Sequence, residues 1–285
     1  MRVQQGCWLL FLWLLLSSES LLARQNLLIY VQAAEGPFKS GFVNALQGSN
    51  ADIRLAPSGE SAELIIALGD DAFSRSAPYG KPVLGVFVSR GLEEKLRRKG
   101  CHCAAIWAGV ALNDQLAMLQ LMMPVAANVG VILGRNSAWS EGTVKEYRGR
   151  LGLKLFKVDD QTQLGRVLRD ELDELDALVL PVDEQLFGPD SAKLVLLTSY
   201  RLRRPVFGPD QSYVHAGSAA SLFASGGDLV SETLIQIEAF SQRRRFRRSG
   251  FVHTPSVIVN EHVANSFDMR FHDSEALRSA LEVMP

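Results

Sequence analysis

Cysteine is scarce in this sequence, and familiar metal-binding patterns are missing with it. Of three cysteines, Cys7 lies in the apolar N-terminal segment, and the other two are Cys101 and Cys103 on either side of His102. A structural zinc site needs about four ligands at familiar spacing, which this short motif does not supply. A disulfide between two residues so close on a strand would be strained. We interpret the pair as structural or incidental thiols, with a strained redox pair or a metal site as alternatives, and we expect no cofactor and no metal.

Catalytic and nucleotide-binding motifs are also missing. The sequence has no G-x-S-x-G nucleophile elbow and no P-loop, and residues 32–36 (QAAEG) replace the glycine fingerprint after the first apolar run. The histidines stand singly, at positions 102, 215, 253, 262 and 272, without H-x-x-x-H spacing. Single histidines of this kind are usually surface or core residues. The sequence therefore predicts no catalytic residues and a protein that is not an enzyme.

The chain lacks an excess of charge of either sign. It has 30 Lys and Arg against 31 Asp and Glu, with a net charge of −1, which argues against nucleic acid as a partner. The densest run is Arg243–Arg248, with Phe246 inside it. Cations are favourable near a helix C-terminus, so we interpret the run as a solvated helix end. The alternative is a patch for an anionic partner or membrane headgroups, since one aromatic residue is too little for nucleic acid.

The one long apolar run lies at the N-terminus. Trp8–Leu16 follows Met1-Arg2 and precedes small and polar residues up to Ala23. This pattern is typical of a secretory signal peptide, whereas a spanning helix needs about 20 apolar residues. We predict a signal peptide over residues 1–23, with cleavage after Ser20 or an uncleaved anchor as alternatives. The mature protein is expected in the periplasm, without stable membrane insertion after removal of the leader.

From residue 26 onward, short apolar runs alternate with amphipathic stretches. Strands are predicted over 27–31, 63–68, 82–88, 104–107, 128–133, 154–158, 176–181, 205–207 and 255–259. Helices are predicted over 38–46, 92–99, 112–123, 140–151, 164–172, 191–202, 228–240 and 260–267. Continuous apolar runs bounded by Gly and Pro indicate parallel sheets built from βαβ units. Because the series restarts near residue 128, we predict an α/β protein of two similar Rossmann-like lobes with parallel sheets, divided within 121–127.

Polar residues at the carboxyl ends of the predicted strands are the candidate ligand-binding residues. Ligands of open parallel sheets bind outside these ends, where helix N-termini also offer N–H groups. The candidates are Gln32, Asp70, Ser89, Asn136, Ser137, Asp183 and Asp210. Asn136, Ser137 and Asp183 directly follow strongly apolar runs and are the strongest of the set. The alternative for each residue is an N-cap that satisfies its own helix.

Five stretches between residues 127 and 265 carry a family resemblance through their order and spacing. They are Val129–Leu133 before Asn136-Ser137, Leu175–Asp183, Arg204–Gly208, Ala216–Ser221, and Val257–Asn260 with Val263-Ala264. Together they resemble the second lobe of the ABC-transporter substrate-binding proteins whose relatives bind tryptophan-like amino acids. The first lobe matches more loosely, through residues 27–31, Gly41-Phe42 with Leu46, and residues 66–69 and 120–124.

The resemblance implies a type I periplasmic binding fold, in which three segments cross between the lobes and a ligand is closed in the cleft. It implies a first lobe of residues 24–122 plus about 225–250, and a second of 123–224 plus about 251–285. The implied function is the periplasmic substrate-binding component of an ABC-type uptake system, which captures a small polar solute for a permease. The alternative is an interaction or sensory module of the envelope that partners a receptor or a sensor kinase.

Two places depart from the family's pattern. Gln32-Ala33 stands where members tend to have Ser or Thr, and Asp70-Asp71 follows Gly69 in place of a small hydroxyl residue. A carboxylate pair at that place is expected to repel a ligand's own carboxylate.

Overall fold

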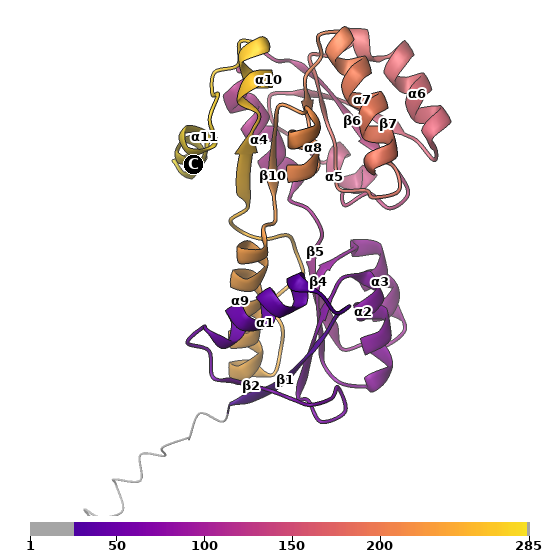
Figure 1. The fold of residues 1–285 in the computed structure, drawn as a ribbon. Helices are drawn as coiled ribbons and strands as arrows, with labels where there is room; N and C mark the ends of the chain where they lie inside the picture. The colour runs from indigo at the N-terminus through magenta and orange to yellow at the C-terminus, as the bar shows by residue number, and fades with distance from the viewer. Residues whose placement is uncertain (1–25, 284–285) are drawn as a thin grey trace, which may run out of the picture.

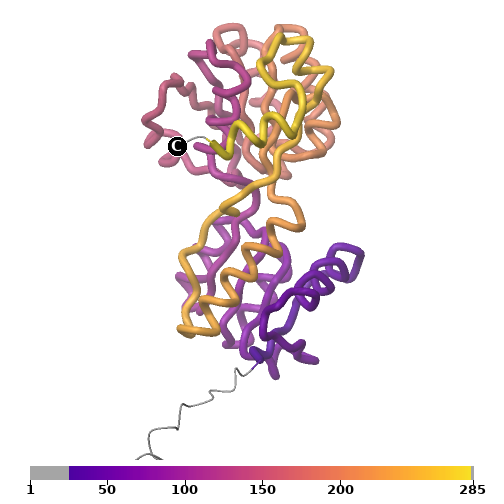
Figure 2. Tube along the Cα trace, turned by 90° about the vertical axis from the view of Figure 1, so that its left-hand side faces the viewer, coloured from indigo at the N-terminus to yellow at the C-terminus, as the bar shows by residue number. Residues whose placement is uncertain are grey.

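The computed structural model describes residues 26–283 as two α/β lobes, one above the other, joined by three crossing segments (Figures 1 and 2). The predicted signal peptide lies outside the described residues. The crossings lie between Trp107 and Leu112, between Phe223 and Gly226, and between Gly250 and Ser256. No helix of the described part is long and apolar enough to cross a membrane.

The first lobe is built on a five-stranded parallel sheet of order β2-β1-β3-β4-β5. Its strands are β1 (Leu27–Gln32), β2 (Ile53–Leu55), β3 (Leu64–Leu68), β4 (Val83–Val88) and β5 (Cys103–Trp107). Its helices are α1 (Pro37–Gln47), α2 (Asp70–Ser76), α3 (Arg90–Arg98) and α9 (Gly226–Arg243), with a 3-10 turn at Ala77–Tyr79. Helices α1 and α9 cover one face and α2 and α3 the other, so α9 returns to this lobe from far along the chain (Figure 1).

Burial on both faces explains why these strands are continuous apolar runs. All five residues of β3 are buried, and they alternate between two cores. Leu64 and Ile66 join the core under α1 and α9, whereas Ile65 and Ala67 join the core under α2 and α3. Helices on both faces of a parallel sheet require this pattern.

The second lobe repeats the plan in a six-stranded sheet of order β11-β10-β9-β8-β6-β7, in which only β11 runs antiparallel to its neighbour. Its strands are β6 (Asn128–Leu133), β7 (Gly152–Lys157), β8 (Ala177–Val179), β9 (Val206–Phe207), β10 (Ala220–Phe223) and β11 (Ser256–Val259). Its helices are α4 (Leu112–Met122), α5 (Glu141–Lys145), α6 (Gln161–Asp170), α7 (Pro189–Arg201), α8 (Gln211–Ala216), α10 (Glu261–Ser266) and α11 (Ser274–Glu282), with a 3-10 turn at Leu172–Glu174. The predicted class of two α/β lobes with largely parallel sheets is confirmed.

Helix α4 lies on the second lobe, which corrects the predicted boundary. The helix contacts β10 and α11. The Gln115 amide donates to the Leu222 carbonyl oxygen at 3.0 Å and accepts from the Leu222 N–H at 3.2 Å. Strand β9 is only two residues long, and this amide takes the place of a neighbouring strand beside β10. The chain therefore leaves the first lobe directly after β5, before the division predicted within 121–127.

The helix predicted over 140–151 is also too long, because α5 ends at Lys145. The Arg148 guanidinium donates to the carbonyl oxygens of Lys145 and Tyr147 at 2.7 and 2.9 Å. These bonds satisfy carbonyl groups at the helix end, which would otherwise need another helical turn or water. Five elements were not predicted at all: β2, α2, α8, β10 and α11.

Hydrogen bonds tie the crossing segments together. One Asp228 oxygen, in the first turn of α9, accepts from the N–H of Ser225 at 2.8 Å and from the N–H and hydroxyl of Ser256 at 3.0 and 2.7 Å. This carboxylate joins the second crossing to the third. The Trp139 indole donates to the Val110 carbonyl oxygen at 2.7 Å, which fixes the first crossing to the second lobe. The connection is thus a set of short, mutually bonded segments.

Candidate ligand-binding cleft

A cavity of about 860 Å³, here called the central cleft, lies between the lobes. Its lining residues come from both lobes and the first crossing: Ala34, Leu68–Ala72, Arg75, Phe87, Ser89, Ala108, Asn136, Ala138 and Val182–Gln185. They stand mainly at the carboxyl ends of strands, where ligands of open α/β sheets bind. The volume is typical of small-molecule sites.

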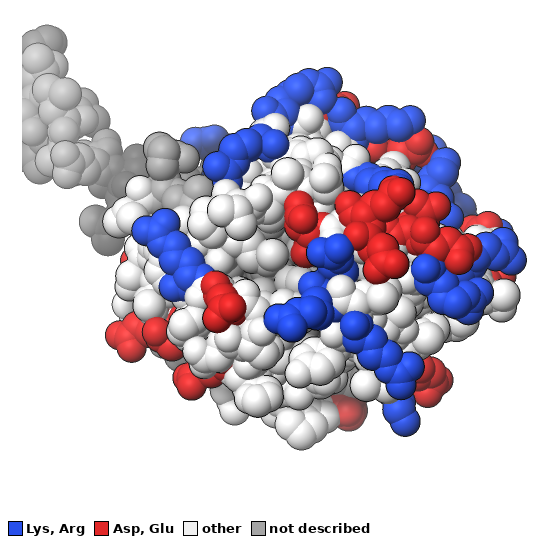
Figure 3. Space-filling view, turned by 90° about the horizontal axis from the view of Figure 1, so that it is seen from above, with Lys and Arg blue, Asp and Glu red and all other residues white. Residues whose placement is uncertain are grey.

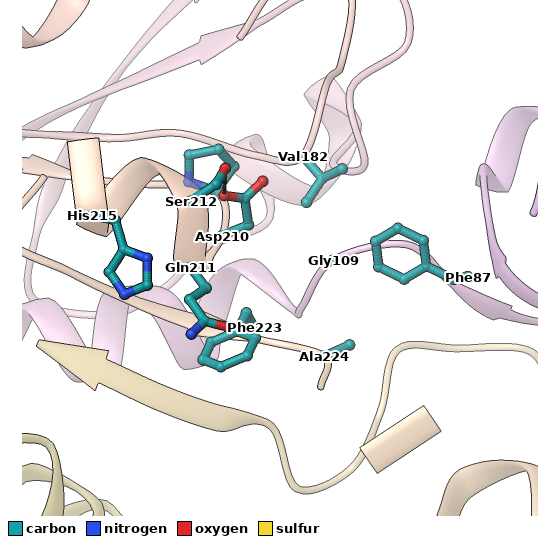
Figure 4. A pocket seen from close by; sticks show the side chains of 10 residues that line it. Phe87, Gly109, Val182, Asp210, Gln211, Ser212, His215, Phe223 and Ala224 are labelled. Carbon is teal, nitrogen blue, oxygen red and sulfur yellow. Dashed lines mark hydrogen bonds between the residues drawn. The ribbon is translucent and has the colours of Figure 1, made fainter. Parts of the chain in front are cut away.

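Two smaller spaces adjoin the central cleft and share lining residues with it. The hinge recess, about 360 Å³, shares Phe87 and Val182 and is otherwise lined by Gly109, Pro209–Ser212, His215, Phe223 and Ala224 (Figure 4). The flank recess, about 680 Å³, lies at Ser89–Leu92, Glu94-Lys95, Leu133–Glu141 and Lys157–Asp159. The three spaces therefore share parts of their walls, and the hinge recess near the crossings is lined by both apolar and polar residues.

Six of the seven candidate residues line these spaces. Asp70, Ser89, Asn136 and Asp183 line the central cleft, Ser137 the flank recess and Asp210 the hinge recess. Gln32 lines none of the three. It shares a face of β1 with Leu28 and Tyr30, which pack under α2 and α3.

In the first lobe, the Asp70 carboxylate is bound to the neighbouring loop. Gly69, with φ 83°, connects β3 directly to α2 and so places Asp70 at the first helical position. The Asp70 carboxylate accepts from both the N–H and the hydroxyl of Ser89, each at 2.7 Å. Ser89 is the N-cap of α3. The Asp70 carboxylate therefore lies beside the positive end of α3 and binds its N-cap residue.

In the second lobe, Ser137 and Asp183 hold their loops in shape. Ser137 accepts from the Gly134 N–H at 2.8 Å and donates to Asp183 at 3.1 Å, and Asp183 also accepts from the Leu186 N–H at 3.1 Å. Asp183 is only 3% exposed. A Cβ on Gly134 would collide with this carboxylate, so the close approach requires glycine. Both residues thus support the rim of the cleft.

The other two candidates of the second lobe have different local roles. Asn136 is exposed, and its amide donates to Gln185 at 2.8 Å across two loops of the rim. Asp210 is the N-cap of α8, with its carboxylate accepting from the Tyr213 N–H at 3.0 Å and the Ser212 hydroxyl at 2.6 Å. The capping alternative therefore applies to Asp210, although its side chain also lines the hinge recess (Figure 4).

Phe87 is the main cleft residue that the sequence did not indicate. The register between β4 and β5 shifts between Val86 and Val88, and Phe87 has φ 55°. A positive φ is a true outlier for a bulky residue. This bulge breaks the alternation of β4 and directs the ring toward Val182 of the second lobe (Figure 4). Simple period-two reading of the strand cannot detect such a bulge.

Charge is distributed unevenly along the inter-lobe space. The flank recess contains paired charges: Arg90 with Glu94 at 2.9 Å, Arg135 with Asp159 at 2.8 Å, and Lys157 with Glu141 at 3.0 Å. The central cleft is lined by the carboxylates of Asp70, Asp71, Asp183 and Glu184, with Arg75 as its one cationic lining residue. The central cleft is therefore the negatively charged part.

Surface charge outside the cleft is mixed. Seen from above in Figure 3, acidic and basic side chains lie interleaved over the second lobe. On this lobe Lys154 contacts Glu171 and Glu174, each at 2.7 Å. Such exposed pairs contribute little to stability and indicate a solvated face.

The basic run of the first lobe is partly folded against its helices. Phe246 stacks on Phe240 with ring centroids 4.9 Å apart, and Arg244 contacts Glu63 at 2.9 Å. The run follows the C-terminus of α9, where cations are favourable. This arrangement supports the interpretation of the run as a helix end, and the anionic partner stays a prediction.

No metal-binding cluster is found among residues 26–283, where no three His, Cys, Asp or Glu side chains are placed to hold an ion. Cys101 and Cys103 are free thiols, the first half-buried and the second buried. The intervening His102 lies against the Phe246 ring, with centroids 5.8 Å apart. The structure contains no disulfide between these two cysteines.

Comparison with known proteins shows which solved structures share the fold of this chain. The chain matches no protein-family model and no curated protein. It matches an ABC domain from Streptococcus pneumoniae crystallised with L-Trp, at 14% identity and a TM-score of 0.58, over 85% of this chain and 94% of that one. It also matches a ligand-free, open substrate binding protein with adhesive properties from Clostridium difficile, at 18% identity and a TM-score of 0.62, over 86% of this chain and 95% of that one. The chain has the type I periplasmic binding fold.

A third match extends the same likeness. A conserved domain protein from Vibrio cholerae aligns at 12% identity and a TM-score of 0.58, over 88% of this chain and 97% of that one. The type I fold thus covers both lobes and confirms the architecture implied by the sequence resemblance. At these identities the likeness concerns the fold, so function has to be argued from the cleft.

Proposed function

We propose that this protein is a substrate-binding protein that captures a small polar solute between its lobes. The observation that carries the proposal is the central cleft, about 860 Å³ in volume and lined by strand-end loops of both lobes. A solute held there would contact both lobes at once. Hinge closure around a ligand is a standard motion of such two-lobed proteins.

The crossing segments support closure. Gly109, in the first crossing, has φ 90°, a conformation that glycine adopts without strain. A Cβ at this position would lie 3.1 Å from the Val182 side chain. Glycine therefore allows the crossing to lie against the second lobe close to the cleft, where a change in the lobe angle would be absorbed.

The finer proposal is an exported component of an ABC-type uptake system that delivers its solute to a permease. The predicted signal peptide supports export, and two of the structural neighbours are described as an ABC domain and a substrate binding protein. On this proposal the mature protein works in the periplasm. Its partners are then one small-molecule ligand and one membrane permease.

A second candidate function is an interaction or sensory module of the envelope that partners a receptor or a sensor kinase. It is favoured by the hydrogen bonds within the rims. Asp70 is bound to Ser89, and Ser137 to Asp183, so these polar groups are already satisfied without a ligand. These four side chains therefore need a ligand less than unpaired rim groups would.

The test is ligand-induced stabilisation of the mature protein across a panel of amino acids, sugars, nucleosides and organic cations. A ligand that binds only the folded state at 100 times its Kd adds about 2.7 kcal/mol to the free energy of unfolding. Asn136→Trp places a bulky ring on the exposed rim and should abolish the stabilisation. Thr162→Trp is the matched control, because Thr162 is exposed on α6 and lines none of the three spaces.

The outcomes separate the two functions. Stabilisation by one class of compound that is lost in Asn136→Trp and kept in Thr162→Trp supports solute binding. A flat response across the panel, or a response that Asn136→Trp leaves intact, contradicts it. Capture of a purified receptor or kinase domain by a protein with a flat response would favour the interaction module.

A further inference from the structure

Two carboxylates of the central cleft, one on each lobe, have no partner within residues 26–283. Asp71 stands in the first turn of α2, and Glu184 lies on the loop after β8. Both are exposed, both line the central cleft, and neither makes a hydrogen bond or ion pair with another described residue. Their neighbours Asp70 and Asp183, in contrast, are bound to their own loops.

From this arrangement we propose that the central cleft takes an organic cation, whose ammonium or guanidinium group lies between Asp71 and Glu184. The inference rests on the proposed function, because it names the ligand class of the same cleft. Charged groups that remain unpaired on facing walls attract a ligand of opposite charge and repel one of the same sign.

A buried charge in the cleft wall points to the same ligand class. Asp183 is 3% exposed and has only the neutral Ser137 hydroxyl and Leu186 N–H as donors. No described Lys, Arg or His forms an ion pair with it. Buried carboxylates are normally paired with a cation, and an uncompensated one favours a cation nearby. A ligand cation in the adjoining cleft supplies the missing charge.

On the first-lobe wall of the central cleft, two carboxylates lie near the start of α3. The N-cap residue of α3, Ser89, is bonded to Asp70 through its N–H and its hydroxyl, so a negative charge already stands beside this helix start. Asp71 follows Asp70 directly in the chain. An anionic ligand would have to approach both carboxylates with only Arg75 as compensation. Like charges brought together cost free energy, which disfavours this ligand class in the central cleft.

The adjoining hinge recess favours an organic rather than an inorganic cation. Phe87 of the first lobe lines this recess together with Phe223 and Val182 of the second lobe (Figure 4). Aromatic faces attract ammonium and guanidinium groups and cover their carbon chains. The part of the chain that the structure describes holds no cluster of three metal-ligating side chains. The site thus combines carboxylates with aromatic and aliphatic side chains, in a recess that Asp210, Gln211, Ser212 and His215 also line.

The same charges couple ligand binding to closure. Asp71 and Glu184 belong to opposite lobes, so closing the empty cleft brings two negative charges together. A cation between them replaces repulsion with attraction. Ligand binding and closure therefore stabilise one another, and the coupling is screened by salt because both groups are exposed.

The experiment compares cations with uncharged molecules of similar shape. Isothermal titration at neutral pH uses choline against 3,3-dimethyl-1-butanol, putrescine against 1,4-butanediol, and agmatine as a guanidinium probe. At least one cation should bind, more than tenfold tighter than its uncharged counterpart, with affinity falling as salt rises. Asp71→Asn and Glu184→Gln should each weaken that binding about tenfold.

Matched variants separate a site effect from a change in overall charge. Glu60→Gln on the first lobe and Asp170→Asn on the second remove exposed carboxylates that line none of the three spaces, and they should leave Kd unchanged. Unfolding midpoints of all four variants should equal that of the parent protein, because each replaced side chain is exposed.

Each result decides the inference. Binding of an uncharged sugar or of a carboxylate, unaffected by Asp71→Asn and Glu184→Gln, would overturn the cation and leave the proposed function intact. Equal weakening by the two control variants would overturn the assigned position. If no probe and no compound of the wider panel bound, the cation and the solute-binding function would both fail.

Discussion

The two lobes repeat one sheet plan. The order β2-β1-β3-β4-β5 in the first corresponds to β7-β6-β8-β9-β10 in the second, to which β11 adds an antiparallel edge. An acidic residue that accepts backbone hydrogen bonds stands just before the third strand of each sheet, β3 in the first lobe and β8 in the second. Glu63 accepts from the Leu28 N–H at 3.1 Å, and Asp176 accepts from the N–H groups of Ala127 and Asn128, both at 2.8 Å. The two sheets therefore share the same strand order and the same position for an acidic residue.

The cleft-facing rims of the two lobes differ. In the first lobe β3 ends at Leu68 and α2 begins at Asp70, so short turns present helix N-termini. In the second lobe β8 ends at Val179 and α7 begins only at Pro189, so a longer loop intervenes. Buried Asp183 holds that loop, whereas Asp70 links two helix starts at the surface. Ligand chemistry thus varies in loops on a conserved type of scaffold.

The largest expected effect comes from removing the two rim carboxylates in turn. Asp183→Ala leaves the buried Leu186 N–H and the Ser137 hydroxyl without their acceptor and should lower the free energy of unfolding by about 2–3 kcal/mol. Asp70→Ala removes bonds at a solvated helix start and should cost only about 1 kcal/mol. Urea unfolding of the mature protein measures both.

Glu184→Ala is the matched control for Asp183→Ala, since it removes the next carboxylate of the same loop, which is exposed and unbonded to any described residue. Its effect should stay within about 0.5 kcal/mol. Equal costs for Asp183→Ala and Asp70→Ala would show that the two rims are supported alike.

A smaller effect is expected for the pH and salt dependence of stability that Asp176 and Glu63 contribute. The Asn128 and Ala127 N–H groups, with nearby Arg204, lower the pKa of Asp176, and the Leu28 N–H, followed by Arg244, lowers the pKa of Glu63. A lowered folded-state pKa gives stability that is present above the unfolded pKa, near 4, and lost as pH falls through the folded value. Asp176→Asn and Glu63→Gln should both flatten the loss of stability on acidification.

Salt separates the two variants. The Arg244–Glu63 pair is exposed and screened, so high salt should shrink the effect of Glu63→Gln. The effect of Asp176→Asn should persist, because it depends mainly on two backbone N–H donors. Urea unfolding between pH 3 and 7 at low and high salt checks this, and an equal salt response of both variants would contradict it.

The smallest effect concerns thiols that only the first lobe carries. A hydrogen bond from Cys103 lowers the pKa of the Cys101 thiol, whereas the same bond and then burial raise the pKa of Cys103. Because the thiolate is the nucleophile, iodoacetamide at neutral pH should alkylate Cys101 and spare Cys103 until the protein unfolds. Peptide mass spectrometry reads the result.

Cys101→Ser is the control for this prediction, since burial alone should still protect Cys103. Similar alkylation rates for the two thiols, or an intact Cys101–Cys103 disulfide in the native protein, would contradict it. The disulfide result would favour the strained redox pair among the interpretations of the sequence.

Local sequence patterns predicted most of the strands and helices, but they predicted less well how these elements pack together. The bounds of β6 follow its apolar run, and α9 extends the predicted helix only by a few residues at each end. Short or polar elements such as β10 and α2 went unpredicted, because their sequences are typical of loops as well. Helix α4 was predicted correctly but placed in the wrong lobe, since its partner Leu222 lies 107 residues away.

The candidate site shows the same division. Strand-end position brought six of seven candidate residues to the inter-lobe space, because parallel strands deliver their carboxyl ends to one edge. Gln32, at the end of β1, lines none of the three spaces, and strand-end position did not indicate Phe87, which a bulge turns toward the cleft. Neither outcome is visible in residue type.

The sequence by itself determined two α/β lobes with buried parallel strands, because burial on both faces leaves continuous apolar runs that can be read locally. Only the tertiary structure decided which polar side chains hydrogen-bond within the protein and which are left free to bind a ligand. Asp70 reaches Ser89 across 19 residues and Asp183 reaches Ser137 across 46, while Asp71 and Glu184, next to them in sequence, stay unbonded to described residues. Neighbours of the same chemical type thus differ in role, because hydrogen-bond partners are set by distance in space.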